Sequence, residues 1–188
     1  MSIRVKLSKL SDEEMTDINS ELVFEVPKTK FTKSTRTEYI HAFQAEEDTV
    51  LLPFAYTIET LRLRGRKREA YTERKVVFEA ELRDAQKEVY QAGLKALSTY
   101  GHTLLSLPTG FGKTFLSIKL STVTKLKTLI IVNKIVLMNQ WLESIAKFCP
   151  SAKVQVLKSK KDMDPDIDFY VINAINIPKK EAGYFNDI

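Results

Sequence analysis

The sequence has few residues that could crosslink the fold or hold a structural metal. It contains one cysteine, Cys149, and two histidines, His41 and His102, among 188 residues. A single thiol excludes an internal disulfide framework, and so few soft ligands, far apart in the sequence, do not make a structural zinc site. We therefore expect a fold that is held together by a hydrophobic core.

Long apolar runs are also missing. The longest uninterrupted run is a few residues around 129–132, whereas a transmembrane helix needs about 20. The N-terminus alternates apolar and polar residues from Ile3 to Ser8 and lacks the apolar centre of a signal peptide. No membrane partner is predicted, and we expect an intracellular protein.

Glycine and proline are scarce, at six residues each, and 44% of the residues are hydrophobic. This composition excludes collagen-like, low-complexity and disordered chains. The net charge is +5, and the whole surplus lies in residues 73–188, which carry 17 Lys and Arg against 12 Asp and Glu. A basic excess of this kind is typical of proteins with a polyanionic partner, although it does not require one.

Residues 1–72 are predicted to form a small α+β accessory module. Ser11 and Glu14 have the spacing of a capping box, which predicts a helix that ends near Asn19. Alternating or β-branched stretches predict strands at 3–7 and 22–26, and a hairpin made of 39–43 and 49–52.

From residue 73 to 188 predicted strands and helices alternate. Strands are expected at 76–78, 103–107, 128–132, 153–157 and 169–172. Helices are expected at 84–98, 114–120 and 136–148. Because alternation of this kind is typical of a parallel sheet covered by helices, the sequence predicts an α/β domain.

A candidate phosphate-binding loop lies between a predicted strand and a predicted helix. Its residues are Leu107, Pro108, Thr109, Gly110, Phe111, Gly112, Lys113 and Thr114. The two glycines allow a tight turn that brings backbone N–H groups onto phosphate oxygens, and the following helix directs its positive end at the same anion. Lys113 can reach the β- and γ-phosphates, and the Thr114 hydroxyl can hold Mg²⁺. The alternative is a tight turn with a surface lysine.

The loop resembles motif I of superfamily 2 helicases and translocases, in which the first glycine of the general pattern is often replaced. Residues 82–86 resemble the Leu-Arg-x-x-Gln box of that family, residues 129–141 resemble motif Ia, and residues 169–173 resemble motif Ib or its neighbour. The resemblance covers about residues 74–188 and is strongest for XPB-like and UvsW-like helicases. Similar proteins occur in large DNA viruses of the poxvirus and African swine fever virus type, so a viral protein would reside in the host cytoplasm or the virion.

The resemblance implies a P-loop, RecA-like parallel sheet, incomplete in residues 73–188, with ATP and Mg²⁺ as ligand and cofactor. Lys113 and Thr114 would be the catalytic residues, and Thr114 the metal ligand. The ATP-binding set would be Arg83, Gln86, Pro108, Thr109, Gly110, Phe111, Gly112, Lys113 and Thr114. Within it, Gln86 would recognise adenine.

The resemblance also implies nucleic acid as a partner, DNA more than RNA. The candidate contacts from motifs Ia and Ib are Asn133, Lys134, Gln140 and Asn173. A second candidate set is the basic cluster, which we define as Arg62, Arg64, Arg66, Lys67 and Arg68. Five cations in seven residues could bind phosphates, or they could form a solvated turn.

The family pattern continues with a strand that ends in Asp-Glu and with a second RecA-like domain. Neither is found before Ile188, so we expect the N-terminal part of a longer enzyme that is inactive by itself. Three alternatives stay open: an ATPase that moves along duplex without separating the strands, an RNA helicase, and a nucleic-acid-binding module with a vestigial nucleotide site.

Overall fold

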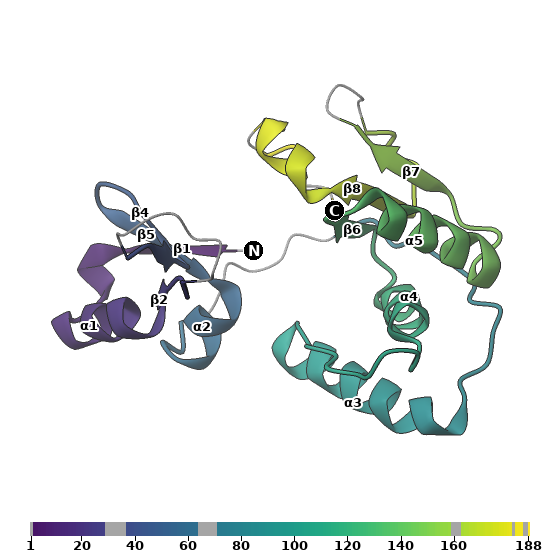
Figure 1. Cartoon of the computed structure of the whole chain (residues 1–188), viewed down its shortest axis with the longest axis horizontal. Helices are drawn as coiled ribbons and strands as arrows, with labels where there is room; N and C mark the ends of the chain where they lie inside the picture. The colour runs from purple at the N-terminus through teal and green to yellow at the C-terminus, as the bar shows by residue number, and fades with distance from the viewer. Residues whose placement is uncertain (1, 29–36, 64–70, 159–162, 182, 186–187) are drawn as a thin grey trace. The chain divides into compact units, whose positions relative to one another are not determined.

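The computed structural model describes residues 2–28, 37–63, 71–158, 163–181, 183–185 and 188 (Figure 1). The chain divides into two compact units, Met1–Arg68 and Glu69–Ile188. We describe each unit by itself. The first unit ends at Arg68, whereas the sequence predicts the accessory module over residues 1–72. The roles of the two parts stay predictions.

The first unit combines short antiparallel strands with two helices. One sheet has the strand order β1-β5-β4, and β2 pairs with β3 in a separate ribbon. The strands are β1 (Ser2–Lys6), β2 (Val23–Glu25), β3 (Tyr39–His41), β4 (Gln44–Ala45) and β5 (Thr49–Pro53). The helices are α1 (Asp12–Glu21), α2 (Phe54–Glu59) and the 3-10 turn η1 (Leu7–Lys9).

Helix α1 begins where the sequence predicts. The Ser11 hydroxyl accepts from the Glu14 N–H at 3.1 Å, and the Glu14 carboxylate accepts from the Ser11 N–H at 2.8 Å. This capping box satisfies two of the N–H groups that the first helical turn leaves unpaired. Ile18 then lies on the inner face, fully buried against Val5 and Leu52 in the core of the unit.

The hairpin prediction was wrong in its pairing. Strand β3 pairs with β2, with Phe24 opposite Ile40, and β5 pairs with β1 over five residues. Only the two-residue strand β4 forms a hairpin with β5. Strand β5 is buried at Val50 and Leu52, so it takes the central position between β1 and β4.

The second unit is a mixed α/β fold with a parallel three-stranded sheet. The sheet has the order β6-β8-β7, and its strands are β6 (Thr128–Val132), β7 (Val154–Leu157) and β8 (Phe169–Asn173). The helices are α3 (Asp84–Tyr100), α4 (Lys113–Thr124), α5 (Ile135–Phe148) and the 3-10 helix η2 (Ala174–Lys179). This confirms the α/β class and these three strands and three helices.

Both faces of the central strand β8 are buried in this unit. On one face, Ile118 of α4 and Ile145 of α5 pack against Val171 of β8. On the other face, Tyr170 and Ile172 pack with partly buried residues that include Ile177 of η2 and Tyr184. Because successive side chains of a strand point to opposite faces, a strand buried on both faces is apolar throughout, as Phe169–Ile172 is.

Two predicted strands of this unit are absent. Residues 76–78 and 103–107 have no ladder partner within the described residues, and Leu104 is 91% exposed. An apolar, β-prone segment forms a strand only where a neighbouring strand accepts its hydrogen bonds. These two segments therefore run as irregular chain, although their composition predicts strands.

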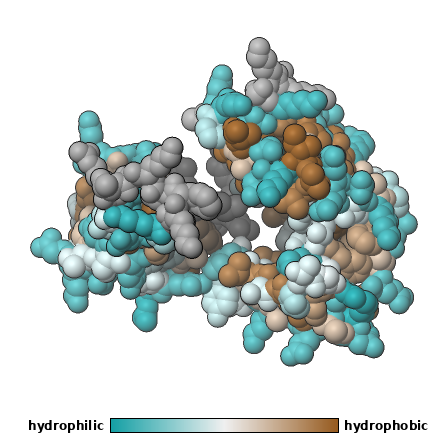
Figure 2. Space-filling model, viewed as in Figure 1, coloured by the Kyte–Doolittle hydropathy of each residue, from teal (hydrophilic) through white to brown (hydrophobic). Residues whose placement is uncertain are grey.

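Apolar residues also reach the surface of the second unit (Figure 2). The most exposed ones after Leu104 are Ile175 and Val136, at 70% and 66%.

Among the described residues, no helix has the length and apolar character to span a bilayer.

Candidate nucleotide site

The predicted phosphate loop leads directly into α4. Its glycines adopt left-handed backbone conformations, with φ of 79° at Gly110 and 102° at Gly112, which is the N-cap of α4. Residues with a Cβ rarely adopt these angles. The local turn that the sequence predicts is therefore present, with α4 beginning at Lys113.

The side chains around position 112 also require a glycine there. A Cβ placed on Gly112 would lie 2.6 Å from Nε2 of Gln86 and 3.4 Å from Nη2 of Arg83, whereas a Cβ on Gly110 would meet nothing within 4 Å. The start of α3 and the phosphate loop therefore lie in direct contact. The structure thus brings together two parts of the predicted site that are 26 residues apart in the sequence.

Arg83 and Gln86 meet at one atom, the backbone carbonyl oxygen of Phe111. The Gln86 Nε2 donates to this oxygen at 2.8 Å, and the Arg83 Nη2 donates to it as well. The Gln86 Oε1 accepts from the Arg83 N–H at 3.1 Å, which holds the glutamine at the start of α3. Gln86 is only 3% exposed, so its amide is fixed by the loop on one side and by its own helix on the other.

Lys113 turns back onto the loop. Its Nζ donates to the carbonyl oxygens of Leu107 and Pro108, at 2.8 and 3.1 Å. An ammonium group has three donors, so one stays available, and the two carbonyl contacts can be exchanged for contacts with a phosphate. Thr114, the second residue of α4, is half-buried.

These residues fit a nucleotide phosphate chain. The first N–H groups of α4 have no carbonyl partner within the helix, and the helix adds partial positive charge at the same end. The exposed Lys113 adds a full charge, and the backbone at Gly110 is open, with nothing within 4 Å of the position that a Cβ would take. The side chains of the loop offer a metal only the hydroxyls of Thr109 and Thr114 and no carboxylate, which suits a Mg²⁺ ion that is held mainly by phosphate and water. Thr114 is the predicted ligand.

The predicted nucleic-acid residues of motifs Ia and Ib lie at the carboxyl edge of the sheet. Val132 pairs with Asn173, so Asn133 and Lys134 follow β6 at the same edge at which β8 ends. The Asn173 Oδ1 accepts from the Ile175 N–H at 3.2 Å and caps η2. Gln140 is exposed further along α5.

The basic cluster falls mostly outside the described residues. Arg62 is described and has a φ of 53°. Arg64, Arg66, Lys67 and Arg68 lie in the part of the chain that is not described. The role of the cluster therefore stays a prediction.

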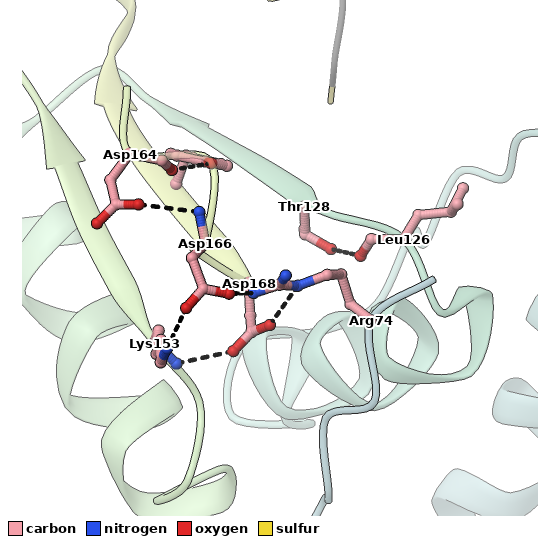
Figure 3. A network of polar contacts seen from close by, with 8 residues as sticks. Arg74, Leu126, Thr128, Lys153, Asp164, Asp166 and Asp168 are labelled. Atoms are coloured by element: carbon pink, nitrogen blue, oxygen red, sulfur yellow. Dashed lines mark hydrogen bonds and ion pairs between the residues drawn. The ribbon is translucent and has the colours of Figure 1, made fainter. Parts of the chain in front are cut away.

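An ionic network that the sequence patterns did not predict lies at the amino edge of the sheet (Figure 3). Arg74 Nε lies 2.8 Å from Asp168 Oδ1, and Arg74 Nη2 lies 3.1 Å from Asp166 Oδ1. Lys153 forms an ion pair with Asp166 and donates its backbone N–H to Asp168 Oδ2 at 2.8 Å. The only signal in the sequence is the alternation of Asp164, Asp166 and Asp168 before β8.

The charges in this network stabilise one another. The hydrogen bond that Arg74 donates to Asp168, together with the one that it donates to Asp166, raises the pKa of Arg74 against the opposing effect of burial. The hydrogen bonds from Lys153 and Arg74 lower the pKa of Asp166 below its usual range. Lys153 has a raised pKa, chiefly because it is bonded to Asp166. All three groups are therefore held in their charged forms.

The family of the chain follows from comparison with known proteins. The family described as "Type III restriction enzyme, res subunit" matches residues 79–185, which include α3, the phosphate loop and the whole parallel sheet. The chain belongs to this family. The match to the res-subunit family confirms the superfamily 2 helicase resemblance predicted from the motifs.

Individual relatives agree with the res-subunit match. The chain is 33% identical over 190 residues to "Putative helicase 161L" of Invertebrate iridescent virus 6, with 98% of the chain and 42% of the relative covered. It is 33% identical over 156 residues to "Putative helicase 109L" of Invertebrate iridescent virus 3, with 77% and 47% covered. It is 43% identical over 68 residues to "DNA 3'-5' translocase XPB2" of Sulfurisphaera tokodaii, with 36% and 15% covered. The chain thus spans less than half the length of these relatives.

Proposed function

We propose that the chain is the N-terminal part of an ATP-dependent superfamily 2 DNA helicase or translocase and binds ATP with Mg²⁺ at the phosphate loop. The observation that carries this proposal is the convergence of Arg83 and Gln86 on the Phe111 carbonyl. Gln86, which we expect to read adenine, lies against the loop that we expect to bind phosphate, and this contact supports the proposal. Membership in the res-subunit family supports a helicase-type enzyme.

Gln86 has the hydrogen-bonding capacity that adenine recognition requires. A glutamine amide has two N–H donors and an oxygen that can accept twice. In the structure one donor is used by Phe111 and one acceptor position by Arg83. One donor and one acceptor remain, and this pair matches the adenine edge, where guanine presents the reversed pattern.

The other loop residues would bind the phosphates. ATP with Mg²⁺ supplies a transferable γ-phosphoryl group when it is bound. Lys113 would exchange its contacts with Leu107 and Pro108 for contacts with the β- and γ-phosphates. The Thr114 hydroxyl would hold Mg²⁺, and the N–H groups at the start of α4 would bind phosphate oxygens.

The polar residues at the carboxyl edge of the sheet support nucleic acid as the partner. We propose DNA rather than RNA because of the name of one relative. Asn133 and Lys134 follow β6 and Asn173 ends β8, so three polar side chains from two strands lie at one edge. The name of the Sulfurisphaera relative specifies DNA. A second RecA-like domain of the same polypeptide would complete the enzyme.

The test is titration calorimetry of ATP-Mg²⁺ and GTP-Mg²⁺ against the 188-residue chain and two variants. Lys113→Ala removes the charged phosphate contact, and Lys95→Ala removes an exposed charge on α3. A charged hydrogen bond is worth about 1.5 to 3 kcal/mol, so Lys113→Ala should weaken both nucleotides about 10- to 150-fold and leave their ratio unchanged. Lys95→Ala should bind like the parent. A parent that binds neither nucleotide, or a Lys113→Ala variant with parental affinity, would contradict the proposal.

A further inference from the structure

We infer that Arg74 is a positioning residue for adenine selection, and that it acts through residues 74–83. This segment, which we call the strap, runs from the ionic network at the amino edge of the sheet to the phosphate loop. The inference rests on the proposed function, because it concerns how Gln86 is held in place to read a base.

The strap has no secondary structure that could fix its course. Its ten residues belong to no described helix or ladder, and Val77 is 60% exposed. An extended segment of this length can span about 30 Å, so it can link distant parts of the unit. Its position therefore depends on a small number of contacts along its length.

The first contact is made by Arg74, at the start of the strap (Figure 3). Its guanidinium binds the carboxylates of Asp166 and Asp168, and its backbone N–H donates to the Lys125 carbonyl at 2.9 Å. The side chains of Arg74 and Asp168 are only 15% and 13% exposed, so this pair is much less screened than a surface ion pair.

The second contact lies midway along the strap. The Glu79 N–H donates to the Phe148 carbonyl at 2.7 Å, at the end of α5. The Phe78 ring packs edge-on against Phe115, with centroids 5.1 Å apart, and Lys119 lies over the same ring at 4.5 Å. Phe115 directly follows Thr114, so this contact reaches the first turn of α4.

The strap ends at the nucleotide site. Arg83, its last residue, donates to the Phe111 carbonyl and also caps α3 through the Gln86 side chain. Helix α3 also packs closely against α4 further along, where a Cβ on Gly93 would lie 3.1 Å from Leu120 Cδ1. That contact lies two turns from Gln86. The first turn of α3 is therefore fixed by the strap through Arg83 and by the hydrogen bond from Gln86 to the Phe111 carbonyl.

Removal of the Arg74 contact should therefore affect base recognition and spare phosphate binding. A detached strap adds conformations in which Arg83 and Gln86 no longer meet the Phe111 carbonyl. The apparent affinity for the adenine nucleotide is then the intrinsic affinity multiplied by the fraction of molecules that keep the competent arrangement. The loop glycines, Lys113 and the start of α4 do not belong to the strap, so contacts common to ATP and GTP persist.

The experiment compares the 188-residue chain with Arg74→Gln, Arg74→Lys and Lys87→Gln. Lys87 is the matched control, because Lys87→Gln removes one positive charge from α3 itself. Among the described residues, Lys87 forms an ion pair only with the 97% exposed side chain of Asp84. Each protein is titrated with ATP-Mg²⁺ and GTP-Mg²⁺, and amide hydrogen exchange is measured at Glu79 and at the buried Ile130.

Arg74→Gln is expected to reduce the ATP to GTP affinity ratio by about 5-fold or more, within the usual range of coupling between sites, with GTP affinity retained. Exchange should accelerate at Glu79 and stay slow at Ile130, which shows that the sheet is folded. Arg74→Lys keeps the charge but lacks the planar guanidinium that contacts two carboxylates at once, so it should restore part of the ATP to GTP affinity ratio.

Three results overturn the inference, and they differ from one another. A parental ratio in Arg74→Gln, in a chain that binds ATP and ceases to do so in Lys113→Ala, overturns the role of Arg74 alone. A parent that binds no nucleotide overturns the proposed function and the inference together. An equal fall in the ratio in Lys87→Gln would assign the effect to general charge and would also overturn the role of Arg74.

Discussion

The Gln86 side-chain nitrogen lies 2.8 Å from the carbonyl oxygen of Phe111 and donates a hydrogen bond to it. The residue that is expected to read adenine is therefore also a support of the phosphate loop. Since the same amide retains one donor and one acceptor, both roles can be held at once.

Gln86→Ala should reduce the preference for ATP over GTP. A mismatched buried polar group costs about 1 to 3 kcal/mol, so the parental preference should be about 5- to 150-fold, and the variant should lose it mainly by weaker ATP binding. Fluorescence titration of both nucleotides measures this ratio. Gln91→Ala, which changes an exposed glutamine of the same helix, should keep the parental ratio. If Gln86→Ala keeps it too, Gln86 does not read adenine.

Alanine at Gly112 should destabilise the second unit more than alanine at Gly110. Both glycines have positive φ, which costs a residue with a Cβ about 1 to 2 kcal/mol. Only Gly112→Ala also places a Cβ 2.6 Å from Gln86 Nε2, which adds about 1 to 3 kcal/mol of overpacking. Urea unfolding followed by the fluorescence of Trp141, the only tryptophan, measures both changes in this unit.

The collision can be separated from the backbone strain by a double variant. Gly112→Ala combined with Gln86→Ala removes the atom that the new Cβ would meet. The double variant should therefore be less destabilised than the sum of the single variants. Strict additivity would show that the close approach of Gln86 to Gly112 does not contribute to the loss of stability in Gly112→Ala.

Cys149 should be unreactive in the folded protein at pH 8 to 9. The thiol is 1% exposed, and burial, with a smaller contribution from Glu79, raises its pKa to about 11. Because the thiolate is the nucleophile, iodoacetamide should label Cys149 slowly until urea unfolds the chain. Fast labelling of the folded chain, at the rate of an unfolded control, would contradict this burial.

The raised pKa of Cys149 also predicts a loss of stability at alkaline pH. Between the ordinary thiol pKa of 9.0 and the folded value of about 11, the unfolded chain releases the Cys149 proton and the folded chain retains it. The free energy of unfolding should therefore fall as pH rises through this window. In Cys149→Ala this part of the decline should disappear, which a pH series of urea unfolding curves can measure.

Nucleic-acid binding should depend on the basic cluster. Neutralising Arg62, Arg64 and Arg66 together should flatten the dependence of log K on log salt by about 0.9 for each phosphate of duplex DNA that the variant no longer neutralises. The control neutralises three exposed lysines on helices of the second unit, Lys87, Lys95 and Lys147. An unchanged slope in the first variant would indicate that the cluster is a solvated turn.

The sequence by itself determined the elements that depend on local interactions. The capping box of Ser11 and Glu14 specifies the start of α1, because its partners lie within one turn. Gly110 and Gly112 specify the turn before α4, because only glycine adopts such angles readily. The apolar stretches at 128–132 and 169–172 also predicted β6 and β8. Strand β8 is buried at Phe169–Ile172, and a strand buried on both faces is uniformly apolar.

Only the tertiary structure decided which segments pair and which distant residues meet. Residues 76–78 and 103–107 are as strand-like in composition as β7, yet they lack a ladder within the described part of the chain, because a strand requires a partner that composition does not name. The contacts between Arg74 and Asp168, 94 residues apart, and between Gln86 and Phe111, 25 residues apart, arise when helices and strands pack. Packing fixes such pairs in space, whereas hydrophobic periodicity encodes only the local conformation of each segment.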